Sequence, residues 1–124
     1  MIEKKGGTMD HTLKSIDAKL YRGYRIISGK EGMKINDLLL LALKAYLEAD
    51  KKEVKKYDLP DDAIERELTI YNIPEDLFQK LKVKSEKHNK NIDDLIIDAL
   101  YELVFDKEVD YRKELLNIEE DEFH

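Results

Sequence analysis

The stretch that decides the fold is Leu68-Thr69-Ile70-Tyr71-Asn72-Ile73-Pro74-Glu75-Asp76-Leu77, because it contains both a strand and the start of a helix. Its first six residues are rich in β-branched and aromatic types. They form too short a run for a helix and predict a strand that ends at Pro74. Proline suits the first turn of a helix, and acidic side chains are favourable near the positive end of the helix dipole. The residues from Pro74 onward therefore predict a helix that follows the strand directly.

Two helices are predicted after this strand. An apolar face that begins at Leu77 and Leu81 predicts a first helix that ends near Lys87. Residues 88–91 break the pattern, and Asn91 is a natural N-cap for the next helix. That second helix has a broad apolar stripe at three- and four-residue spacing, formed by Ile92, Leu95, Ile96, Ala99, Leu100, Leu103 and Val104. A stripe of this width must be buried.

The same plan occurs twice in the chain. A shift of 57 positions places residues 12–48 on residues 69–105 without a gap. Ten of these 37 positions are identical: Thr12/Thr69, Ile16/Ile73, Leu20/Leu77, Ser28/Ser85, Lys30/Lys87, Ile35/Ile92, Asp37/Asp94, Leu38/Leu95, Ala42/Ala99 and Leu43/Leu100. An internal repeat determines how the whole fold is interpreted. Each copy is too small to bury a core alone, so the copies must pair within the chain or with a second chain.

The first copy predicts the same elements at its own positions. We expect a strand over His11–Ile16, a helix from Asp17 to about Lys30, a break at Gly32 and a helix from Ile35 to about Ala49. The second helix of this copy is apolar on more than one face, which is typical of a helix in the middle of an assembly.

The two copies divide the chain into five segments. Residues 1–10 contain Gly6-Gly7 and no periodicity and predict a flexible arm. The first unit covers 11–49, a charged linker covers 50–67 and the second unit covers 68–105. Residues 106–124 form an acidic tail that includes a short helical pattern.

Composition limits the class of protein. The chain has 124 residues, of which 42% are apolar and 40% charged, and it has no cysteine. The absence of cysteine excludes disulfides, thiol catalysis and cysteine metal sites. The high content of charged residues, together with the lack of cysteine, suits a hot, reducing cytoplasm. No stretch approaches the roughly 18 apolar residues of a membrane span, and residues 1–7 lack the apolar core of a signal peptide. We therefore expect a soluble, cytoplasmic protein without membrane contact.

Charge is distributed unevenly along the chain. Residues 1–56 carry 13 Lys and Arg against 8 Asp and Glu, whereas residues 57–105 carry 6 against 12 and residues 106–124 carry 3 against 8. Such asymmetry suggests a basic surface for an anionic partner, although surface charge also varies along a chain without any function. Sequence-independent attraction to such a partner is expected from six lysines of the arm and linker, although lysines of this kind are more often simply solvated: Lys4, Lys5, Lys51, Lys52, Lys55 and Lys56.

Three short segments carry a resemblance to a known family. They are the junction Asn72–Leu77 and the two breaks, Gly32-Met33-Lys34-Ile35-Asn36 and Asn89-Lys90-Asn91-Ile92-Asp93. A strand, a helix, a Gly or Asn break and a second helix resemble the ribbon-helix-helix family of DNA-binding regulators. The resemblance covers both copies, and the duplicated form is similar to tandem regulators encoded by archaeal viruses. It implies a mainly α fold with a short antiparallel β-ribbon, in which the β-α-α unit occurs twice.

The resemblance also implies a transcription regulator whose partner is double-stranded DNA, in the host cytoplasm if the protein is viral. It would act as a dimer or as an internal pseudo-dimer, without cofactor, metal or small-molecule ligand. The physics of strands agrees with this architecture, because an isolated strand leaves its backbone donors unpaired. Antiparallel pairing of two strands gives a ribbon of the width that the major groove admits. The strands can come from one chain or from two.

The residues that would contact bases depend on which side of each strand faces outward. Side chains alternate along a strand, so counting back from a buried Ile16 and Ile73 gives one outward set. That set is His11, Leu13, Ser15, Leu68, Ile70 and Asn72. It departs from the family, which usually has Arg, Lys, Thr, Asn or Gln there. A bulge or a one-residue slip instead turns out Thr12, Lys14, Thr69 and Tyr71. Ordinary strand residues without function remain an alternative for both sets.

Phosphate contacts are expected at the start of the second helix of each unit, where free amides and the dipole favour an anion. The family positions are Lys34, Ile35 and Asn36 in the first unit and Asn91, Ile92 and Asp93 in the second. Lys30 reinforces the first set and Lys90 the second. Because Asp93 and Asp94 repel phosphate, we expect the first unit to hold DNA more strongly. Helix capping explains Asn36 and Asn91 equally well.

An enzyme is not expected. His11, His88 and His124 lack metal-ligand spacing, and there is no Gly-rich phosphate loop and no nucleophile with a base. Two other classes remain open. One is a protein-interaction module, like antitoxins of the same family, that binds a partner through residues 106–124. The other is a structural duplication without DNA binding.

Overall fold

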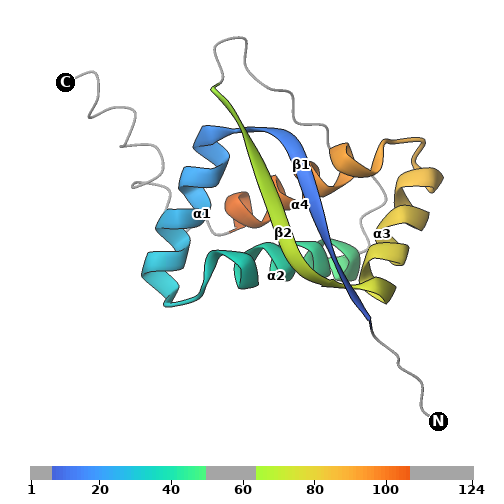
Figure 1. The fold of residues 1–124 in the computed structure, drawn as a ribbon, viewed down its shortest axis with the longest axis horizontal. Helices are drawn as coiled ribbons and strands as arrows, with labels where there is room; N and C mark the ends of the chain where they lie inside the picture. Colours follow the sequence, from blue (N-terminus) through green and yellow to red (C-terminus); the bar gives the residue numbers. More distant parts are fainter. Residues whose placement is uncertain (1–6, 50–63, 107–124) are drawn as a thin grey trace.

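The structure is a computed structural model that describes residues 7–49 and 64–106. Its elements occur in the order strand, helix, helix, twice over (Figure 1). They are β1 Thr8–Asp17, α1 Ala18–Glu31, α2 Ile35–Ala49, β2 Glu65–Pro74, α3 Glu75–Lys87 and α4 Ile92–Asp106. The fold is therefore mainly helical, with one two-stranded antiparallel sheet formed by β1 and β2 of the same chain.

Both strands are longer than the sequence predicts. β1 begins at Thr8, inside the expected arm, and β2 begins at Glu65, inside the expected linker. Pairing extends past the apolar positions because the backbone groups of one strand satisfy those of the other, whatever the side chains are. The rest of the arm (1–6) and linker (50–63), with their lysines, and the tail from residue 107 onward lie outside the described residues.

The pairing of the two strands is symmetric. Thr12 pairs with Thr69, its own equivalent 57 residues later. At one end of the ribbon the Ala18 N–H donates to Ile64 O at 2.8 Å, and at the other end the Glu75 N–H donates to Gly7 O at 2.9 Å. These two contacts are equivalent, because Ala18 corresponds to Glu75 and Gly7 corresponds to Ile64 at the same shift of 57 residues. A pseudo-twofold axis therefore passes between Thr12 and Thr69 and relates the two units of the chain.

Each strand contains one bulge. Between Met9 and His11 the extra residue lies on β2, where Asn72 has a φ of 60°, and between Leu13 and Ile16 it lies on β1. A bulge moves the following side chain to the other face of the sheet. Leu13 and Ile16 consequently both point inward although they are three residues apart.

These bulges correct the expected strand parity. Counting back from Ile16 and Ile73 placed Leu13, Leu68 and Ile70 outward, but their exposed fractions are 1%, 8% and 0%. The count was wrong because it crossed a bulge in each strand. The alternative set is the one that faces outward: Thr12, Lys14 and Tyr71 are exposed, and Thr69 is half-buried.

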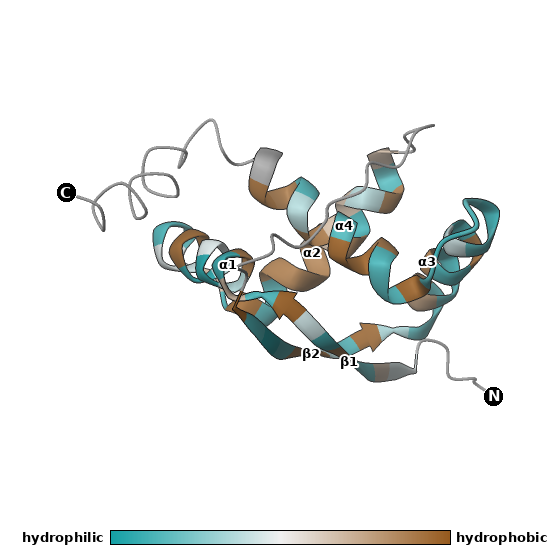
Figure 2. Ribbon diagram, turned by 90° about the horizontal axis from the view of Figure 1, so that it is seen from above, coloured by the Kyte–Doolittle hydropathy of each residue, from teal (hydrophilic) through white to brown (hydrophobic). Residues whose placement is uncertain are grey.

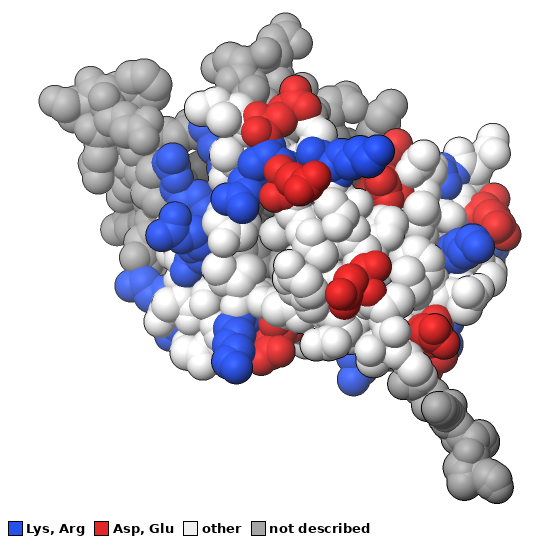
Figure 3. Space-filling view, in the orientation of Figure 1, with Lys and Arg blue, Asp and Glu red and all other residues white. Residues whose placement is uncertain are grey.

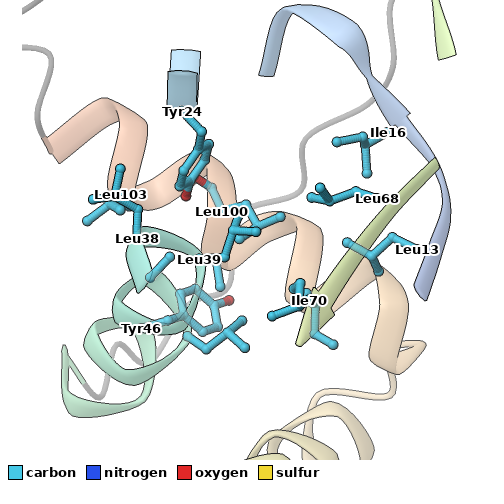
Figure 4. Close-up of a cluster of buried hydrophobic side chains, with 14 of the residues drawn as sticks. Leu13, Ile16, Tyr24, Leu38, Leu39, Tyr46, Leu68, Ile70, Leu100 and Leu103 are labelled. Carbon is cyan, nitrogen blue, oxygen red and sulfur yellow. The ribbon is translucent and has the colours of Figure 1, made fainter. Parts of the chain in front are cut away.

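All four helices lie on one side of the ribbon (Figure 2). α2 and α4 pack against each other beneath it, and α1 and α3 lie at the two ends of this layer (Figure 1). Inward residues of the ribbon, among them Leu13 and Ile70, point toward Leu39 and Leu100 (Figure 4). No described helix or strand covers the other face of the ribbon.

The helix breaks are equivalent in the two units. Gly32 has a φ of 68° and Asn89 a φ of 58°, so both adopt the left-handed conformation that ends a helix. The Met33 N–H donates to Ser28 O at 3.2 Å, and the Lys90 N–H donates to Ser85 O at 2.7 Å. The breaks predicted from the sequence are therefore confirmed. Among the described helices, none is both long and apolar enough to span a bilayer.

Candidate nucleic-acid interface

The uncovered side of the ribbon is the candidate interface, and we call it the outer ribbon face. Strand alternation places eight residues on it: Thr8, Asp10, Thr12, Lys14, Glu65, Glu67, Thr69 and Tyr71. This face carries three carboxylates and one lysine, so its charge is mixed and not strongly basic. Figure 3 shows red and blue side chains interspersed over the ribbon, whereas Lys and Arg gather over α1.

The centre of the outer ribbon face is a pair of hydroxyl groups. The Oγ1 atoms of Thr12 and Thr69 lie 2.8 Å apart and form a hydrogen bond across the pseudo-twofold axis. A threonine presents a donor, an acceptor and a methyl group at once. The pair can therefore form hydrogen bonds with a polar base edge or make apolar contact with a thymine methyl group.

Lys14 and Tyr71 are equivalent residues of the two units and lie on either side of this pair. Both are exposed, Tyr71 by 52%. A lysine ammonium is a donor only, whereas a phenol donates and accepts and adds an aromatic ring. The two sides of the outer ribbon face therefore differ in their chemistry.

A groove runs between β2 and the start of α2. Asn36 connects the two, because its Oδ1 accepts from the Tyr71 N–H at 2.9 Å and its Nδ2 donates to Tyr71 O at 2.8 Å. These bonds satisfy backbone groups that the bulge in β2 leaves without a ladder partner. On the same wall the Arg66 guanidinium stacks 3.8 Å from the centre of the Tyr21 ring. The groove is lined by Tyr21, Ile35, Asn36, Leu39, Arg66, Glu67, Leu68, Thr69 and Tyr71.

The equivalent groove between β1 and α4 is acidic. Asp93 occupies the position of Asn36, and its Oδ1 accepts from His11 Nε2 at 2.6 Å instead of holding the strand backbone. The His11 ring also lies 5.4 Å from the ring of Phe78. This groove is lined by Leu13, Lys14, Ser15, Asn91, Asp93, Asp94 and Ile97. Its two aspartates disfavour an anion.

Two of the predicted base contacts are engaged within the protein through their side chains, and a third through its backbone. His11 bonds Asp93, the Ser15 hydroxyl donates to Glu65, and Asn72 is held in the bulge by a bond from its N–H to Asp10 Oδ1 at 3.0 Å. His11 and Ser15 are half-buried, whereas Asn72 is exposed. Asn72 and the exposed residues of the second set are thus the better candidates for base contact.

The predicted phosphate contacts also separate into two groups. Lys30 and Lys34 are exposed beside the start of α2, whereas Ile35 and Ile92 pack against the core. Asn91 caps α4 by accepting from the Asp93 N–H at 2.8 Å.

Lys90 differs from the prediction. Its ammonium forms an ion pair with the buried Asp98, and the exposed fractions of the two side chains are 15% and 3%. The equivalents of this pair in the first unit are Met33 and Leu41. A lysine that neutralises a buried carboxylate is poorly placed to hold a phosphate.

Sequence reasoning missed the bond of Asn36 to β2, the stacking of Arg66 on Tyr21 and the outward carboxylates of Asp10 and Glu67. The carboxylates had a signal, because both are two residues before the threonines that pair, in equivalent positions of the repeat. The other two contacts join residues far apart in sequence and leave no local pattern. Within the described residues, no His, Asp and Glu side chains gather as a metal site does.

Comparisons with protein-family models, with curated proteins and with solved structures give no match for this chain.

Proposed function

We propose that this chain is a tandem ribbon-helix-helix protein that regulates transcription by inserting the outer ribbon face into the major groove of duplex DNA. The observation that carries the proposal is a two-stranded ribbon with all four helices on one side and none of the described elements on the other. A ribbon of two strands fits the major groove, and its outward side chains reach the base edges.

The side chains of the outer ribbon face support this role. Lys14 can donate to guanine O6 and N7, and the hydroxyls of Thr12 and Thr69 suit either kind of base edge. The threonine and Tyr71 side chains also offer apolar contact to thymine methyl groups. The carboxylates of Asp10 and Glu67 accept from cytosine N4 but oppose binding to phosphate in general. Recognition of particular bases, more than general attraction, is expected to decide affinity.

Phosphate contacts are assigned to the first unit. Lys34 directly precedes α2, and Lys30 lies in the last turn of α1, so two exposed lysines lie close in sequence to the free amides at the start of α2. The first turn of α4 carries two carboxylates that repel a phosphate, Asp93 and Asp94, whereas the first turn of α2 carries only Asp37. The DNA backbone is therefore held at one side of the ribbon more than at the other.

A titration of labelled duplexes at several salt concentrations tests the proposal. Lys34→Glu is expected to weaken binding to all sequences alike. It is also expected to reduce the slope of log affinity against log salt concentration by about the amount that corresponds to one phosphate contact. Lys44→Glu is the matched control, since Lys44 is exposed on the same helix about 15 Å further along. Absence of binding to every duplex at low salt would refute the function, and equal losses in both variants would refute the phosphate site.

One observation favours a second function, a protein-interaction module. The outer ribbon face has more carboxylates than cations, and the sequence continues into the acidic residues 106–124. A chain shortened to residue 105 separates the two functions. Duplex binding through the ribbon survives this truncation, whereas a protein partner held by the acidic segment is lost.

A further inference from the structure

We propose that the DNA site of this chain is non-palindromic and is bound in one orientation only. The inference rests on the proposed function and adds the kind of duplex that the ribbon selects. The two units are related by the pseudo-twofold axis, and they share their backbone arrangement but differ in several of their side chains.

The axis preserves most of the backbone. The strand pairing, the positions of the two bulges and the left-handed residues at the helix breaks are exchanged with their equivalents. The bulges differ in one respect, because Asn72 has a φ of 60° whereas its equivalent Ser15 has no positive φ. Thr12 and Thr69 are identical and face each other at the centre. A scaffold of this kind presents nearly the same frame to the two halves of a duplex, so a preference between the halves comes mainly from side chains.

The axis does not preserve the side chains that flank the centre. Lys14 is equivalent to Tyr71, and Thr8 is equivalent to Glu65. A lysine donates to the two acceptors of guanine, whereas a tyrosine can accept as well as donate and places its ring against apolar groups. The base pairs that satisfy one half of the ribbon therefore differ from those that satisfy the other.

The two grooves beside the ribbon also differ in their side chains. Arg66 stacks on Tyr21 in the groove of β2, and its equivalent in the other unit is the uncharged Met9. Asn36 in this groove is replaced by Asp93 in the groove of β1. The groove of β2 thus has Arg66 with one carboxylate, Glu67, whereas the groove of β1 has Lys14 with two, Asp93 and Asp94. The base-facing side chains and the charges of the grooves therefore both distinguish the two orientations of a duplex.

The test begins with selection of duplexes from a random library by the full chain at low salt. Each half of the best site is then used to build a palindrome, and affinities for the three duplexes are compared by fluorescence anisotropy. We expect the original site to bind at least about tenfold more tightly than either palindrome, since each palindrome mismatches one half of the ribbon. A selected site that is itself palindromic, or a palindrome that binds equally well, would overturn the inference.

A substitution on the ribbon gives a second readout. Tyr71→Lys makes the two flanks of the centre alike, and the Tyr71 ring is not required for the contact with Asn36, which uses backbone atoms. This variant is expected to lower the preference for the original site over the palindrome of the Lys14 half by at least about threefold. Gln79→Lys adds the same charge on an exposed position of α3 and serves as the control.

The outcomes distinguish the two proposals. An unchanged preference in Tyr71→Lys, or the same change in Gln79→Lys, contradicts the oriented readout while duplex binding remains. Selection of no duplex at low salt contradicts the proposed function, and the inference falls with it.

Discussion

Leu13 and Thr12 are neighbours in β1 with opposite environments. Leu13 is 1% exposed and belongs to the core, whereas Thr12 is exposed on the outer ribbon face. The apolar positions of the strands identify the core in general terms. Their parity could not be counted from the sequence, because each bulge forms only when two segments 57 residues apart pair with each other.

Alanine substitution of these two neighbours tests the placement. Leu13→Ala is expected to lower the free energy of unfolding by about 2 to 5 kcal/mol, because it leaves a cavity in the core. Thr12→Ala is expected to cost less than about 1 kcal/mol, since the hydroxyl pair is exposed. Denaturant unfolding of both variants measures the difference. A larger cost for Thr12→Ala would reverse the assignment of the two faces.

Two phenols, one buried and one half-buried, make the stability sensitive to alkali. Tyr24 donates to Leu100 O at 2.6 Å, and burial raises its pKa well above the usual value. Burial first, and then the charge of Asp17, raises the pKa of Tyr101 to about 12. Both groups stay neutral in the folded protein at a pH where the unfolded chain ionises. Their stabilisation is complete below about pH 10 and is lost as the pH rises through the folded-state pKa of each group, which is about 12 for Tyr101.

Tyr24→Phe tests this dependence. At pH 7 the variant is expected to lose about 1 kcal/mol with the hydrogen bond to Leu100 O. Between pH 10 and 12 its free energy of unfolding is expected to fall less steeply than that of the unsubstituted chain, by up to about 1.4 kcal/mol per pH unit. Denaturant unfolding at several pH values measures both effects. Parallel pH curves for the two proteins would show that Tyr24 does not titrate as described.

At the scale of elements, the helices were the most predictable part. α2 and α4 follow from apolar stripes and from the breaks before them, because these signals are local to each helix. The lengths of β1 and β2 were not predictable, since the strands extend through polar residues whose only partner is the opposite backbone. The candidate interface could be predicted from the sequence in part, because the alternative outward set of strand residues is the one that faces outward. The difference between the two grooves could not be predicted, because it depends on contacts between residues that are far apart in the sequence.

The break between α1 and α2 depends on the conformation of Gly32. Its φ is 68°, and an added Cβ would meet no atom within 4 Å, so the backbone strain of an L residue is the only cost. Gly32→Ala is expected to lower the free energy of unfolding by about 1 to 2 kcal/mol. Gly29→Ala is the control, since it also has free space but lies inside α1, where alanine is favoured. Destabilisation by Gly29→Ala and none by Gly32→Ala would contradict this account of the break.

At the scale of the whole molecule, the two units share one core. Leu38 of α2 and Leu95 of α4 are equivalent residues, both fully buried in the same cluster. Leu38→Ala and Leu95→Ala are each expected to cost about 2 to 5 kcal/mol and to lower the midpoint of one common transition. Circular dichroism and tyrosine fluorescence, followed together during unfolding, measure this. Two separated transitions, with each variant affecting only one, would show that the units fold independently.

The central claim is that the outer ribbon face binds in the major groove of DNA. Its most direct test is nuclear magnetic resonance of the full chain during titration with a duplex that the chain binds. We predict that the amide signals of Thr12, Lys14, Thr69 and Tyr71 change most, because the ribbon lies in the groove, and that Val83 on α3 is unaffected. Changes confined to α1 and α3, with an unperturbed ribbon, would contradict the account.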